Sequence, residues 1–91
     1  MVDNSGTGSS VLDAFVHLQR SDPVQNMHRF YRIHVTPGIF QDWVLVREWG
    51  RIGSPGMVRK DCYPTREATV NASQSIVRKK LKKGYTVLCF D

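Results

Sequence analysis

Positively charged and aromatic side chains alternate in the middle of the chain, around the tripeptide Trp49-Gly50-Arg51. The tryptophans of this segment, Trp43 and Trp49, are interleaved with four cations: Arg47, Arg51, Arg59 and Lys60. Arginine and lysine neutralise phosphates, and the planar guanidinium can bind two phosphate oxygens at once. Aromatic rings stack on the bases and sugars of single strands or exposed ends. The pattern therefore predicts a surface that binds nucleic acid.

The positive charge is concentrated in two segments, and acidic residues elsewhere lower the total to a net charge of +5. Residues 29–60 open with Arg29 and carry six basic against two acidic side chains, a net charge of +4. Residues 64–84 carry six basic side chains against Glu67, a net charge of +5, and contain the run RKKLKK at positions 78–83. Two interpretations of that run stay open. It is a phosphate-contacting patch that includes Lys79 and Lys82, or it is a solvated helix end whose cations complement the helix dipole.

The sequence offers little for catalysis or metal binding. Its eight acidic residues form no paired carboxylates, and its three histidines are isolated from one another. The glycine-rich stretch 50–56 is not followed by the lysine that a phosphate-binding loop requires. We therefore expect no enzymatic activity and no cofactor. Cys62 and Cys89 are far apart and form no CxxC pair, so we expect no metal site and no disulfide. Both thiols are predicted to be free and buried or half-buried, as in a reducing compartment.

The first residues lack the basic start and apolar run of a signal peptide, and no segment is long and apolar enough to span a bilayer. The protein is therefore expected to be cytoplasmic.

The elements that must position these residues fit one domain, since the chain has 91 residues. Residues 1–10 are predicted to form a flexible tail, and residues 11–91 the folded domain. Alternating apolar residues predict strands over 11–19, 29–35, 43–49, 57–63 and 85–90, with a turn over 20–28. Pro37-Gly38 is predicted to form a type II turn with the glycine at positive φ. Helical spacing predicts one helix over 65–83, with Thr65 as its N-cap and Gly84 after its end.

This order predicts an α+β fold, an antiparallel sheet of about five strands with one helix packed on one face. In the third predicted strand Trp43, Leu45, Arg47 and Trp49 share a face. We assign Trp43 to the core and Trp49 to the functional surface, because Trp49 lies where the strand meets the glycine-rich loop. The helix is predicted to bury Val70, Ala72, Ser73, Ile76, Val77 and Leu81. Its solvent side is predicted to hold Asn71, Gln74, Ser75, Arg78 and Lys82.

The segment VREWGRIGSPG at positions 46–56 resembles the signature of the WGR domain family. The resemblance continues upstream through DPVQNMHRFYRIHV at positions 22–35 and through Gln41-Asp42-Trp43. It continues downstream through Tyr63-Pro64-Thr65, the basic helix and Gly84-Tyr85. The similar region covers about residues 11–88, nearly all of the predicted domain.

WGR domains occur as short bacterial proteins and as modules of DNA-dependent poly(ADP-ribose) polymerases, where the module engages DNA at a strand break. The resemblance implies an antiparallel sheet with one helix against it. It also implies that Trp49 packs on a terminal sugar and that Arg51 contacts phosphate or signals to neighbouring domains. Gly50, which has no side chain, would keep the backbone from protruding and can adopt backbone conformations that other residues disfavour. Family members often carry Asn where this chain has His28, so the contact of that Asn with DNA does not carry over.

The sequence therefore predicts a nucleic-acid-binding module, with DNA favoured over RNA and an end or a break as the target. The alternative is a protein-interaction module, because a Trp beside an Arg is typical of protein hot spots. A membrane-surface helix is disfavoured by the weakly apolar helix face. The predicted binding residues are Arg29, Arg47, Trp49, Gly50, Arg51, Arg59, Lys60, Lys79 and Lys82.

Overall fold

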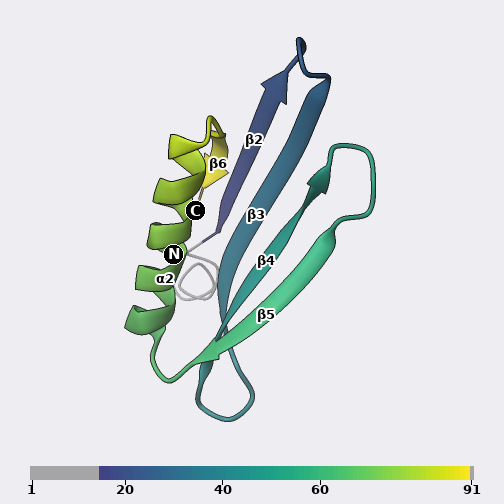
Figure 1. The fold of residues 1–91 in the computed structure, drawn as a ribbon. Coiled ribbons are helices and arrows are strands. Elements are labelled where there is room, and N and C mark those ends of the chain that lie inside the picture. Colours follow the sequence, from purple (N-terminus) through teal and green to yellow (C-terminus); the bar gives the residue numbers. More distant parts are fainter. Residues whose placement is uncertain (1–14, 91) are drawn as a thin grey trace, which may run out of the picture.

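In the computed structural model, which describes residues 15–90, five antiparallel strands form one sheet with a helix on one of its faces (Figure 1). The strands are β2 (Val16–Asp22), β3 (Met27–Pro37), β4 (Trp43–Arg51), β5 (Met57–Tyr63) and β6 (Thr86–Phe90), and the helix is α2 (Arg66–Lys82). Their order across the sheet is β5-β4-β3-β2-β6, so the last strand pairs with β2 after the helix. The predicted α+β architecture is confirmed.

The hairpin between β2 and β3 is tighter than predicted. Pairing continues to Asp22 opposite Met27, so the turn covers only residues 23–26 instead of 20–28. The Asp22 carboxylate accepts hydrogen bonds from the backbone N–H groups of Val24 (3.1 Å) and Gln25 (3.4 Å). Asn26 adopts a φ of 52°, which asparagine tolerates better than most residues. Polar residues at the strand ends hid this pairing from the pattern of apolar residues.

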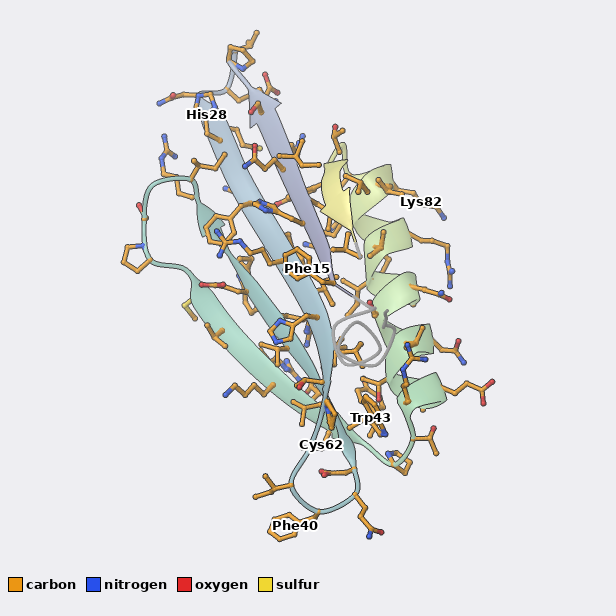
Figure 2. All side chains as sticks on the ribbon, turned by 180° about the vertical axis from the view of Figure 1, so that it is seen from behind. Phe15, His28, Phe40, Trp43, Cys62 and Lys82 are labelled. Carbon is orange, nitrogen blue, oxygen red and sulfur yellow. The ribbon has the colours of Figure 1, made fainter. Side chains whose placement is uncertain are left out.

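The connection between β3 and β4 corrects the prediction of a type II turn at Pro37-Gly38. Gly38 is not among the residues at positive φ, whereas Gln41 has a φ of 63°. The Gly38 N–H donates to the Asp42 carbonyl (2.8 Å), and a Cβ on Gly38 would collide with the Asp42 carboxylate. A side chain here would displace the Asp42 carboxylate, whose Oδ1 accepts a hydrogen bond from the Phe40 N–H (3.3 Å), so glycine favours this close approach and is not needed for its φ. Phe40 lies exposed at the tip of this connection (Figure 2).

The helix begins and ends as its sequence predicts. The Thr65 hydroxyl accepts a hydrogen bond from the Ala68 N–H (3.1 Å), and Gly84 follows the helix with a φ of 96°. Its buried residues are small, Thr69 and Ser73, so the helix can lie close to the sheet. The prediction that Leu81 is buried is wrong, because this side chain is 46% exposed.

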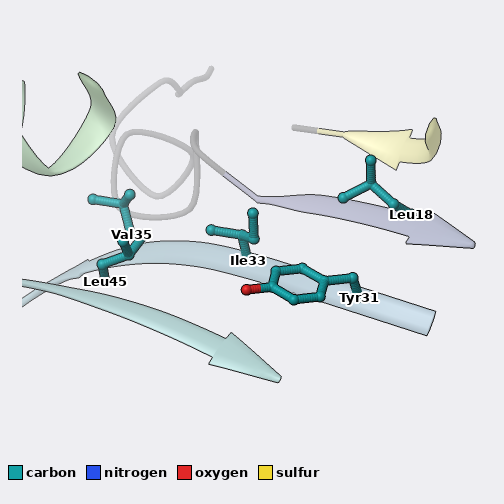
Figure 3. Close-up of a cluster of buried hydrophobic side chains, with 5 residues drawn as sticks. All are labelled: Leu18, Tyr31, Ile33, Val35 and Leu45. Carbon is teal, nitrogen blue, oxygen red and sulfur yellow. The ribbon is translucent and has the colours of Figure 1, made fainter. Parts of the chain in front are cut away.

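The core lies between α2 and the sheet and consists of Leu18, Tyr31, Ile33, Val35 and Leu45 (Figure 3). Because alternate residues of a strand point to opposite faces, these five residues define the helix side of β2, β3 and β4. Half-buried residues of α2, including Val70, Ala72, Ile76 and Val77, pack against them.

Predictions for the tail at residues 1–10 and for the start of the first strand at residues 11–14 lie outside the described residues. Within the described range, α2 is not long and apolar enough to cross a membrane.

Candidate nucleic-acid interface

A cleft lies on the helix side of the sheet, where the C-terminal end of α2 meets β3 and β4. Its volume is about 380 Å³, and it is lined by Arg29, Tyr31, Trp49, Gly50, Arg51, Lys80 and Tyr85. We call it the aromatic cleft. It brings together four of the residues predicted to bind nucleic acid: Arg29, Trp49, Gly50 and Arg51.

Tyr31 is the centre of an aromatic cluster in this cleft. Its ring is stacked on Trp49 with a centroid distance of 5.8 Å and an interplanar angle of 17°. Tyr85 meets the same ring edge-on at 6.4 Å and 78°. Tyr31 is almost fully buried, whereas Trp49 and Tyr85 are half-buried and retain accessible surface. Contacts with Tyr31 thus hold two partly exposed rings in place.

Lys80 comes from α2 and lies against the same aromatic rings. Its Nζ atom is 4.4 Å from the centroid of Tyr31 and 5.4 Å from that of Tyr85, within the range of cation–π attraction. Burial lowers the pKa of this ammonium group, and the nearby charges of Lys83, Arg47 and Arg29 lower it further. These cations repel one another, so a bound anion would relieve the repulsion.

Arg51 projects to the helix side of the sheet, because β3 and β4 pair without a bulge around Gly50. Arg29 and Arg51 are directly opposite each other in this ladder, so two guanidinium groups flank the cleft. Arg51 donates from Nη2 to the Asn26 carbonyl at 3.3 Å, and both arginines are exposed. None of the residues lining the cleft carries a carboxylate.

Gly50 has a different role from the expected one. It is not among the glycines at positive φ, so the expectation that it adopts conformations closed to other residues is wrong. A Cβ at this position would lie 3.0 Å from the Gly56 Cα and 3.5 Å from the Phe30 ring. A Cβ on Gly56 would collide with the Trp49 carbonyl and would lie 2.9 Å from the same ring. The two glycines therefore let β4 and the following loop close over Phe30, on the face away from α2.

The two tryptophans are more alike than predicted. Both are half-buried and pack against the core. Trp43 lies near the start of α2, whereas Lys82 is at the other end of the helix (Figure 2). The Arg66 guanidinium is 6.0 Å from the centroid of the Trp43 ring. Trp49 differs from Trp43 in lining the aromatic cleft, so it is both a packing residue and a surface residue.

Two of the predicted phosphate ligands are engaged within the protein. Asp61 forms ion pairs with Arg47 at 3.0 Å and with Arg59 at 3.3 Å. Burial lowers the pKa of Arg47, but hydrogen bonds to Tyr31 and Asp61 and the charges of these two groups outweigh burial and raise it. Arg47 therefore stays charged beneath Tyr31, and its charge is partly neutralised by Asp61.

The lysines of the helix end lie beside the aromatic cleft. Lys79 and Lys82 line a neighbouring depression of about 430 Å³ together with Tyr31, Arg47, Ile76, Lys80 and Lys83. Both lysines are exposed, so they can approach a phosphate chain that leaves the cleft along α2. The structure thus places these two predicted site residues next to the four in the cleft.

Lys60 and Cys62 lie apart from the cleft, on the edge strand β5. Lys60 is opposite Val46 in the β4–β5 ladder, which places it on the face away from α2. Cys62 is a free, exposed thiol, so the prediction that it is buried or half-buried is wrong. An edge strand has a neighbour on one side only, and for this reason its side chains are poorly covered. The side chain of Cys89 lies outside the described part of the chain.

Three cleft residues were missed by sequence reasoning: Tyr31, Lys80 and Tyr85. Tyr31 was placed in the predicted strand 29–35 without a role, and Tyr85 at the start of the last strand. Lys80 precedes Leu81, and the helix is oriented so that the lysine lies over the rings and the leucine in solvent. The available signal was the position of Lys80 four residues after Ile76, on one side of the helix.

Comparison with known proteins gives one family and one curated relative. The WGR domain model matches residues 14–89. The chain is 36% identical over 70 residues to the protein y4dW of Sinorhizobium fredii (strain NBRC 101917 / NGR234), described as uncharacterized. This match covers 77% of the chain but 34% of the relative, so the chain spans about a third of its length. No solved structure matches the chain significantly.

Proposed function

Because the chain belongs to the WGR domain family, we propose that it is a nucleic-acid-binding module whose aromatic cleft receives the end of a DNA strand. Trp49 offers its accessible face to a terminal sugar or base, while Arg29, Arg51 and Lys80 bind the neighbouring phosphates. Lys79 and Lys82 contact phosphates farther along the strand. The proposed role is binding and not catalysis.

The observation that carries this proposal is the combination of cations and aromatic rings in one cleft without a carboxylate. Three positive groups surround an accessible indole. Burial is the main cause of the lowered pKa of Lys80, and repulsion by Lys83, Arg47 and Arg29 adds to it. A phosphate beside Lys80 would offset this repulsion, and a stacked base or sugar would cover the indole. A ligand with both features is a nucleotide chain.

The preference for DNA and for its ends rests on the family. WGR modules of poly(ADP-ribose) polymerases engage DNA at strand breaks. A cleft of about 380 Å³ is of a size for one end group and not for a duplex. Lys79 and Lys82 can still contact the phosphates along the side of an intact duplex. We therefore expect binding to a closed duplex as well, but with lower affinity than to an end.

The test is a fluorescence anisotropy titration of the full chain with labelled blunt duplex, nicked duplex, covalently closed circle, single strand and an RNA duplex of the same sequence. Lys80→Met and Arg78→Met each remove one positive charge from α2, but Arg78 is exposed and does not line the cleft. We expect Lys80→Met to weaken binding to ends more than Arg78→Met does. Its melting temperature should change little, because the removal of charge repulsion offsets the loss of the cation–π contacts with Tyr31 and Tyr85.

Two results would contradict the proposal. Equal losses for Lys80→Met and Arg78→Met would show that only net charge matters. Equal affinity for the closed circle and the blunt duplex would show that the cleft does not recognise ends.

A further inference from the structure

β5 is an edge strand of the sheet, and one of its sides is unpaired among the described residues. It pairs with β4 over seven regular residue pairs, from Trp43 opposite Tyr63 to Trp49 opposite Met57. No strand of the described residues pairs with its other side. Four consecutive residues are exposed: Met57, Val58, Arg59 and Lys60. The backbone hydrogen-bonding groups along this edge are therefore available to another strand.

A groove runs beside this edge, between β5 and α2. Its volume is about 470 Å³, and its lining residues are Leu45, Arg47, Arg59, Asp61, Cys62, Tyr63, Ala72, Ser75 and Ile76. We call it the edge groove. Ala72 and Ile76 form an apolar part of its wall on α2, and the ion pairs of Asp61 with Arg47 and Arg59 lie along its β5 side. Ser75, predicted to lie on the solvent side of the helix, forms part of its wall.

We propose that an extended acidic peptide segment of another protein pairs with the β5 edge as a sixth strand and inserts alternate side chains into the edge groove. Main-chain hydrogen bonds provide affinity in this mode of recognition, and pockets for every second side chain provide specificity. Because β5 has seven residues, the segment needs about seven residues to cover it. This function is independent of nucleic-acid binding.

The charges of the edge select the sequence of the segment. Side chains on the groove side face Ala72 and Ile76 of α2, so they should be apolar. Side chains on the opposite face lie beside Lys60, which is exposed and has no carboxylate opposite it in the β4–β5 ladder, so they should be acidic. Arg59 has a side-chain exposure of 62% on the groove side, and because it shares the single carboxylate of Asp61 with Arg47, the three groups keep a net positive charge. The favoured segment therefore alternates apolar and acidic residues.

The same charges disfavour a second copy of the chain as the occupant. In a symmetric antiparallel pair centred on the middle of β5, Lys60 would lie directly opposite its own copy. Like charges in directly opposed positions are destabilising. Basic residues on the edge thus prevent pairing with an identical strand and favour an acidic one.

The experiment begins with selection from a displayed library of random peptides about ten residues long, with the full chain immobilised. We expect enriched sequences with apolar and acidic residues in alternation. Amide hydrogen exchange of the chain with a synthetic selected peptide should slow in β5. An enriched sequence set that protects only the aromatic cleft, or no enrichment, would overturn the proposal, and so would a dimer that pairs through β5.

Variants localise the binding. Ser75→Tyr fills the edge groove and should weaken the peptide about tenfold or more, whereas Gln74→Tyr, on the exposed side of the helix, should leave it unchanged. Lys60→Glu should weaken an acidic peptide more than Arg78→Glu does, although both changes alter the net charge equally. Thermal melting checks the fold of each variant. Equal effects within either pair would overturn the proposal.

The proposed peptide binding and the proposed nucleic-acid binding can be tested independently of each other. Ser75→Tyr should retain the anisotropy response to DNA ends, because Ser75 does not line the aromatic cleft. Lys80→Met should retain peptide binding, because Lys80 does not line the edge groove. Loss of both activities in either folded variant would overturn the assignment of two separate sites.

Discussion

Trp49 shows how one residue of this domain contributes both to packing and to the candidate site. Its indole is stacked on Tyr31 and packs against the core, while part of it lines the aromatic cleft. Truncation of such a residue removes buried apolar surface and an accessible ring at once. A loss of binding after mutation is therefore informative only when the free energy of unfolding is measured beside it.

We expect Trp49→Ala to lower the affinity for blunt duplex by about 1–3 kcal/mol, the range for loss of aromatic stacking on a base. The loss should be smaller for a covalently closed circle. Trp49→Phe keeps a ring on Tyr31 and should recover part of the affinity. Anisotropy should be measured below the melting transition of each variant. A folded Trp49→Ala protein with unchanged affinity for ends would disprove the stacking role.

At the scale of the element, α2 combines a buried face of small residues with a basic C-terminal end. Thr69 and Ser73 let it lie close to the sheet, and this brings Lys80 onto the aromatic rings. Lys79 and Lys82 are in the last turn, where cations also stabilise a helix through its dipole. The two interpretations of this basic run therefore make different predictions for binding and for stability.

If Lys79 and Lys82 contact phosphates, Lys79→Glu and Lys82→Glu should each weaken binding of all DNA sequences about equally. Arg78→Glu is the control, since it makes the same change of charge on an exposed residue that does not line the neighbouring depression. Loss of the dipole interaction should cost about 0.3–1 kcal/mol of stability. Affinities that match the Arg78→Glu control would assign the run to helix stabilisation alone.

The whole molecule is polarised. The cations of the aromatic cleft and of the end of α2 gather on the helix side of the sheet, and the edge groove lies on the same side along β5. A net charge of +5 gives the chain a long-range attraction for polyanions, and the clustering directs that attraction to one surface.

This distribution predicts a steep salt dependence. Phosphate contacts by the three cations of the cleft and by Lys79 and Lys82 would give a slope of about −4.5 in a plot of log affinity against log salt for duplex DNA. Anisotropy titrations over a series of NaCl concentrations measure it. An affinity that does not change with salt would contradict electrostatic binding and leave the peptide function as the principal role of the domain.

Local patterns in the sequence determined most of the elements and their faces. Alternation placed Trp43, Leu45, Arg47 and Trp49 on one side of β4, and capping residues marked both ends of α2. Strand and helix periods are properties of neighbouring residues, so they can be read without knowledge of the fold. The clustering of cations with tryptophans and the resemblance to the WGR signature, and not these periods, selected Arg29, Trp49, Gly50 and Arg51, which the structure gathers in one cleft.

Only the tertiary structure decided what surrounds these residues. Tyr31 is far in the sequence from Lys80 and Tyr85, and their meeting depends on how α2 is oriented against the sheet. Asp61 reaches Arg47 because β5 pairs with β4, and Cys62 is exposed because β5 is the edge. The close approach of Gly50 to Gly56 and Phe30 likewise follows from strand pairing. Long-range pairing and helix rotation are determined by the packing of the whole core, which no local pattern encodes.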